Sequence, residues 1–154
     1  MLLTPGDWQG RGSWRPVGET APVSFTALIH VREDEQGFLV EGALESPGSA
    51  DIAVNAWLAP DEFGTWAVTV QAAGINVDGV AKLESVPHLG LLWSDDGLIH
   101  VTFAIFTVRD THGIRGFAKS RRGAITWELA LEPRQRVVAG GNVVSIDARR
   151  RRGG

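Results

Sequence analysis

The fold class is decided by residues 22–45, which read PVSFTALIHVREDEQGFLVEGALE. Apolar and polar side chains alternate there in two runs, on either side of the polar, glycine-ended segment 34–37. Alternation with a period of two puts one set of side chains on each face of a strand, and a short polar segment of this kind forms a turn. The stretch therefore predicts two antiparallel strands, each with one apolar and one polar face.

The same pattern continues in both directions from this pair, over residues 7–132, with breaks at Gly, Pro, Asp and Asn. The runs between these breaks predict about ten strands. They predict no helix, because apolar residues nowhere recur at the three-and-four spacing of a helix. A meander leaves two unpaired edges unless it closes on itself. We expect an all-β fold, a single closed or nearly closed antiparallel up-and-down β-barrel. A two-sheet sandwich is the alternative, which the short connections disfavour.

The composition indicates an ordinary soluble globular protein, with 44% hydrophobic and 21% charged residues. The absence of cysteine excludes disulfides and thiolate metal sites. The N-terminus lacks the basic region and apolar run of a signal peptide, and no stretch approaches the ~20 apolar residues of a membrane span. We therefore expect a cytoplasmic protein with no membrane span.

Two regions are expected in the chain, a barrel over residues 1–136 and a partly disordered extension over residues 137–154. The extension contains a run of four arginines, Arg149 to Arg152. Residues 1–148 carry 11 basic and 18 acidic side chains, a net charge of −7. An acidic body does not suit a nucleic-acid partner, because phosphate binding needs a positive face.

The interior of the barrel is predicted to be apolar, because the polar face of each strand carries nearly all of the strand charges. Small residues such as Gly12 and Gly116 fall on the apolar face and leave room among the large side chains. A cavity for a small ligand is therefore favoured over a filled core, in which the glycines would only accommodate neighbouring rings. The predicted ligand-binding residues are Trp14, Phe25, Ile29, Phe38, Val54, Trp66, Val77, Val101, Phe103, Ile105 and Trp127.

The four histidines are the obvious candidates for metal binding or acid–base chemistry. His30 and His100 fall on the polar face, while His88 and His112 fall at turns. No two of them have close metal-ligand spacing, and no serine has the context of a nucleophile elbow. We therefore expect surface histidines and no metal site.

The first strand carries a family resemblance. Residues 6–16, GDWQGRGSWRP, resemble the first strand of calycin barrels, a lipocalin-like superfamily, and most closely its nitrobindin and fatty-acid-binding-like group. The resemblance implies that Trp8 plugs one end of the barrel and that a terminal basic residue, here Arg134, stacks on its face. Only residues 17–21 follow the strand, so no helical lid is expected. Segment 124–134 lacks the late-strand histidine that holds haem in nitrobindin-like proteins, so we predict no cofactor and disfavour haem.

Three functions follow from these features. The first is intracellular binding of a small hydrophobic or amphipathic ligand inside the barrel. The second is a cofactor-free enzyme of the cyclase or isomerase kind acting on an apolar substrate, steered by an inward Asp78, Asn55 or His100. The third is an interaction protein with a filled core, for which exposed Trp57 and Phe117 would form an interface, such as that of a homodimer.

Overall fold

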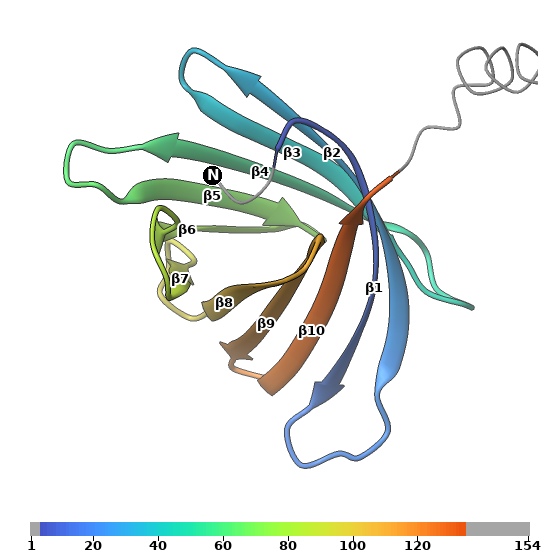
Figure 1. Cartoon of the computed structure of the whole chain (residues 1–154). Helices are drawn as coiled ribbons and strands as arrows, with labels where there is room; N and C mark the ends of the chain where they lie inside the picture. The colour runs from blue at the N-terminus through green and yellow to red at the C-terminus, as the bar shows by residue number, and fades with distance from the viewer. Residues whose placement is uncertain (1–3, 135–154) are drawn as a thin grey trace, which may run out of the picture.

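The computed structural model describes residues 4–134, most of which lie in β-strands (Figure 1). Within these residues there is no helix, so the predicted all-β fold without a helical lid is confirmed. The predicted extension, with its arginine run, lies outside the described residues. The strands are β1 (Gly6–Pro16), β2 (Val23–Asp34), β3 (Gly37–Glu45), β4 (Ile52–Pro60), β5 (Trp66–Ala72), β6 (Ile75–Lys82), β7 (His88–Trp93), β8 (His100–Val108), β9 (Thr111–Ser120) and β10 (Gly123–Pro133).

The ten strands form one closed barrel, as predicted. Each strand pairs antiparallel with its neighbours along the chain, and β1 also pairs with β10. This closing pair runs from Trp8 opposite Pro133 to Pro16 opposite Ile125, and Figure 1 shows the two strands side by side. Because the pairing uses the backbone groups of both terminal strands, the barrel has no free edge. The sandwich alternative is therefore wrong.

The turn between β4 and β5 is held by one carboxylate. Oδ1 of Asp61 accepts hydrogen bonds from the backbone N–H groups of Phe63, at 2.8 Å, and Thr65, at 3.0 Å, and Oδ2 accepts one from the Thr65 hydroxyl. Hydrogen bonds from the Thr65 hydroxyl and then from the backbone lower the pKa of Asp61, because they favour the charged form. The turn is thus stabilised most when this carboxylate is ionised.

We expect Asp61→Ala to lower the melting temperature by a few degrees at pH 7. A folded-state pKa below the ordinary value of 3.8 means that this stabilisation is present above pH 3.8 and is lost as the pH falls through the folded-state pKa. Thermal unfolding at pH 7 and at pH 3 should therefore show a smaller difference between variant and wild type at the lower pH. Asp61→Asn, which keeps the Oδ1 acceptor, should cost less, and equal losses at both pH values would contradict this account.

The two ends of the barrel differ in how deeply their inward side chains are buried. We name them the Trp8 end, where β1 begins and β10 ends, and the Trp14 end, where β1 ends and β10 begins. The buried apolar side chains near the Trp8 end include Trp8, Val31, Trp66, Leu83 and Leu131. At the Trp14 end four inward apolar residues are exposed, at 36% for Trp14, 39% for Val23, 40% for Ile52 and 44% for Ile75, whereas Leu92, the last inward residue of β7, is buried. The barrel is therefore packed at the Trp8 end and more exposed at the Trp14 end on the side formed by β1, β2, β4 and β6.

Candidate functional site

The eleven side chains predicted to line the interior lie on the inward face of the barrel. Four of them, Phe38, Val101, Phe103 and Ile105, pack against the buried cluster that contains Trp66 and Val77. Ile29 packs against the second cluster, around Trp8. The other four occupy inward positions of the alternating register: Trp14, Phe25, Val54 and Trp127.

These side chains form an apolar surface that solvent still reaches. Of the eleven, Trp66 and Val77 are buried, eight are partly buried, and Trp14 is 36% exposed. A barrel filled solidly by its own side chains would bury most of them, because protein interiors pack as densely as organic crystals. The interior wall is therefore apolar and accessible.

Aromatic rings lie over glycines on this inner wall. The Phe25 ring covers Gly12, the Phe103 ring covers Gly90 and the Trp127 ring covers Gly116, each glycine lying on a neighbouring strand. A Cβ at any of these glycines would overlap the ring, so the absence of a side chain lets each ring lie against the sheet. The glycines do accommodate rings, as the filled-core alternative supposed, but the rings are held along the wall.

His88 corrects the prediction of surface histidines. It is the first residue of β7 and is only 8% exposed, and it shares its face of the strand with Gly90 and Leu92, which are also buried. Its cross-strand partner is Ile105, one of the inward residues of β8. The interior is therefore not free of histidine.

One ring nitrogen of His88 has no hydrogen-bond partner among the described residues. Among residues 4–134, His88 Nδ1 is the one buried side-chain nitrogen or oxygen with no partner. Leaving such an atom unpaired costs about 1–3 kcal/mol of stability, and buried polar atoms are nearly always paired. A group kept at this cost is a candidate for binding something that enters the interior.

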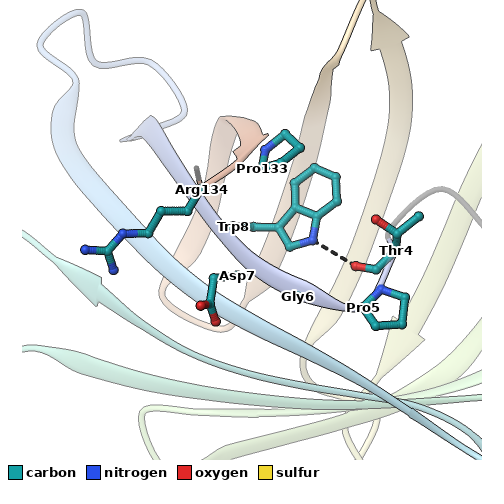
Figure 2. Close-up of a pocket in the computed structure, with 7 residues that line it drawn as sticks. All are labelled: Thr4, Pro5, Gly6, Asp7, Trp8, Pro133 and Arg134. Carbon is teal, nitrogen blue, oxygen red and sulfur yellow. Dashed lines mark hydrogen bonds between the residues drawn. The ribbon is translucent and has the colours of Figure 1, made fainter. Parts of the chain in front are cut away.

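The Trp8 end is plugged by an indole, but its ring partner is different from the predicted one. The Trp8 ring contacts the ring of His112, with centroids 5.4 Å apart and planes at 40°, and its Nε1 donates to the carbonyl of Thr4 at 3.0 Å. Figure 2 shows the Arg134 side chain pointing away from the indole, and its backbone N–H donates to the carbonyl of Asp7 at 2.8 Å. The stacking predicted for Arg134 is therefore wrong, and so is the turn position predicted for His112.

A shallow cleft surrounds this junction of the chain ends. Its volume is about 400 Å³, and its lining residues are Thr4, Pro5, Gly6, Asp7, Trp8, Pro133 and Arg134 (Figure 2). A second cleft of about 160 Å³ shares Asp7, Trp8 and Arg134 with it and adds His30, whose Nδ1 lies 2.6 Å from Asp7 Oδ1. A carboxylate can orient an imidazole as a base, but neither cleft is lined by a serine or cysteine that such a base would activate.

The polar residues on which the enzyme hypothesis depends do not reach the interior. Asp78 is exposed and accepts a hydrogen bond from the Thr69 hydroxyl at 2.6 Å. His100 is exposed, as predicted, with Nε2 2.8 Å from the carbonyl of Gly97. Asn55 pairs with Glu41 in the outward-facing row of side chains. None of the three positions therefore supplies an inward acid, base or donor.

The outer wall carries an exposed apolar patch, which we name the β7 patch. It consists of Val80 on β6 and Leu89, Leu91 and Trp93 on β7, each between 39% and 48% exposed. Val80 is paired directly with Leu91, so the patch is continuous. Trp57 and Phe117 are exposed as well, as the interaction hypothesis requires.

Residues 4–134 hold neither a cluster of three metal-ligating side chains nor the late-strand histidine that the family resemblance implies for haem. Within residues 4–134 no three His, Cys, Asp or Glu side chains come together where they could hold a metal ion. The inward residues of β10 are Ile125, Trp127, Leu129 and Leu131, and none of these side chains ligates iron. Haem therefore does not fit the late-strand route that the family resemblance implies.

Two further observations bear on the class of the protein. Among residues 4–134 there is no apolar helix of membrane-spanning length. Comparison of the chain with protein-family models, with curated proteins and with solved structures finds no match.

Proposed function

We propose that this chain is a calycin-like barrel that binds a small apolar or amphipathic molecule in its interior. One observation carries the proposal: the inward face is apolar, yet nine of the eleven interior residues named above remain accessible to solvent. Hydrating apolar surface costs free energy, and each 100 Å² that a ligand covers contributes about 2.5 kcal/mol before the costs of association. The rise in exposure toward the Trp14 end favours that end as the route of access.

A fluorescent apolar probe, N-phenyl-1-naphthylamine, tests the proposal. Wild-type protein should bind it saturably with enhanced fluorescence. Val54→Trp places a large side chain on the inward face of β4 and should weaken binding at least about tenfold, since it occupies the space and apolar surface that the probe needs. Ala53→Trp is the matched control, because Ala53 is the preceding residue and is exposed on the outer face. The affinity of this variant for the probe should stay within about twofold of wild type.

Circular dichroism and thermal unfolding should show that both variants keep the barrel fold. Absence of saturable binding by the folded wild type would refute the proposal. Equal affinity in wild type and Val54→Trp would refute binding in the interior.

A second candidate function is association through the β7 patch. Exposed apolar groups that are continuous over two strands are typical of interaction surfaces. The function would then be docking of a partner, such as a second copy of the chain, and the interior would have no ligand. Sedimentation equilibrium tests the homodimer, and a monomer at all accessible concentrations would exclude it.

A further inference from the structure

His88 places a buried ring nitrogen without a hydrogen-bond partner on the inward face, near the packed end of the barrel. The ring lies opposite Ile105, and Ile105 packs against the buried apolar cluster that contains Trp66 and Leu92. The alternation of β7 turns His88 inward with Leu92, while Leu89 and Leu91 face outward. The imidazole is thus a polar group in apolar surroundings, on the wall of the proposed binding space.

The chemistry of this ring defines the partner that it lacks. An imidazole nitrogen either accepts or donates one hydrogen bond, and Nδ1 has no partner among the described residues. Rotation about the Cβ–Cγ bond is soft for histidine, so the ring can present this nitrogen when a polar partner arrives. One hydrogen-bonding oxygen on an otherwise apolar molecule would satisfy it.

We propose that His88 holds the polar end of the ligand, which is a molecule with an apolar body and one hydrogen-bonding oxygen. The oxygen lies against His88 near the Trp8 end, and the apolar body extends toward the accessible Trp14 end, against the aromatic rings of Phe103 and Trp127. This inference rests on the proposed binding function, and it adds the class and the orientation of the ligand.

A matched series of naphthalenes separates the two proposals. Naphthalene tests interior binding alone, 2-naphthol adds a hydroxyl that donates and accepts, and 2-methoxynaphthalene adds only an acceptor. Wild type should prefer 2-naphthol to naphthalene. In His88→Leu we expect the affinity for 2-naphthol to fall about tenfold and that for naphthalene to stay the same or rise. His100→Leu, which removes an exposed histidine, should change neither affinity.

The same variant separates a binding role from a structural one. Since His88→Leu removes an unpaired buried nitrogen, the ligand-free variant should melt at the same temperature as wild type or a few degrees higher. Parallel losses of both affinities together with a lower melting temperature would identify a structural histidine and overturn the inference. Failure of naphthalene to bind wild type would instead refute the proposed function.

NMR of the wild-type protein tests the inference without any variant that could misfold. In wild-type protein labelled with ¹⁵N at histidine, 2-naphthol should shift the imidazole nitrogen resonances of His88, and naphthalene should shift them much less. Equal effects of the two compounds would overturn the inference, even if both of them bind.

Discussion

Trp8→Ala should lower the free energy of unfolding by about 3–5 kcal/mol. The Trp8 ring is 4% exposed and packs with Ala27, Val31 and Leu131, so its loss leaves a cavity in the packed end of the barrel. The hydrogen bond from Nε1 to Thr4 and the contact with His112 are lost as well. Domains are stable by only about 5–15 kcal/mol, so this variant should be partly unfolded in mild denaturant.

Trp14→Ala is the matched control on the same strand. Trp14 is also inward but is 36% exposed, so removal of its ring should cost about 2 kcal/mol less than removal of the Trp8 ring. Equilibrium unfolding in urea measures both variants. Equal losses would show that the two ends of the barrel are packed alike, which contradicts the structure described above.

Gly79→Ala should have the second-largest effect, a loss of about 3 kcal/mol. A Cβ at Gly79 would overlap the carbonyl oxygen of Leu91 and crowd the Cα of Leu92 at 2.8 Å. These are backbone atoms that cannot rotate away, so β6 and β7 must separate and their hydrogen bonds must lengthen.

Val80→Ala, at the next residue on the outer face, provides the comparison and should cost about 0.5 kcal/mol. Urea unfolding gives both free energies. Amide hydrogen exchange should show lost protection in β6 and β7 in the glycine variant alone. A Gly79→Ala protein as stable as wild type would mean that β6 and β7 are not as close as the structure places them.

The fold could be predicted from the sequence because nearly every strand repeats the same alternation of apolar and polar side chains. In β2, the apolar set that contains Ile29 and the polar set that contains Arg32 leave one choice of inward face, and the short polar turns require neighbouring strands to pair. Closure followed from the cost of free edges. The structure shows this closure in the pairing of β1 with β10, where Trp14 lies opposite Trp127.

The position of His88 could not be predicted, because β7 reverses the usual pattern. Its outward set, Leu89, Leu91 and Trp93, is more apolar than its inward set, His88, Gly90 and Leu92. Hydrophobicity alone therefore assigns the wrong faces to this strand. The signal that remains is Gly90, because an inward Phe103 ring needs a glycine beneath it on the neighbouring strand.

The partner of Trp8 could not be predicted for a different reason. Arg134 follows the end of β10, beside Trp8, and His112 lies at the start of β9, on the strand next to β10. The choice depends on the register that brings His112 opposite Leu131, two residues before Pro133. Such a register cannot be obtained from the spacing of residues along the chain.

The central claim, that the interior is the binding site, is tested most directly by the indole N–H resonances of the six tryptophans. Titration of ¹⁵N-labelled protein with naphthalene should shift the signals of Trp14 and Trp127, whose rings lie on the inner wall, and leave those of the outward Trp57 and Trp93 in place. Shifts confined to Trp57 and Trp93, with Trp14 and Trp127 unmoved, would contradict the claim and place the binding surface on the outside of the barrel.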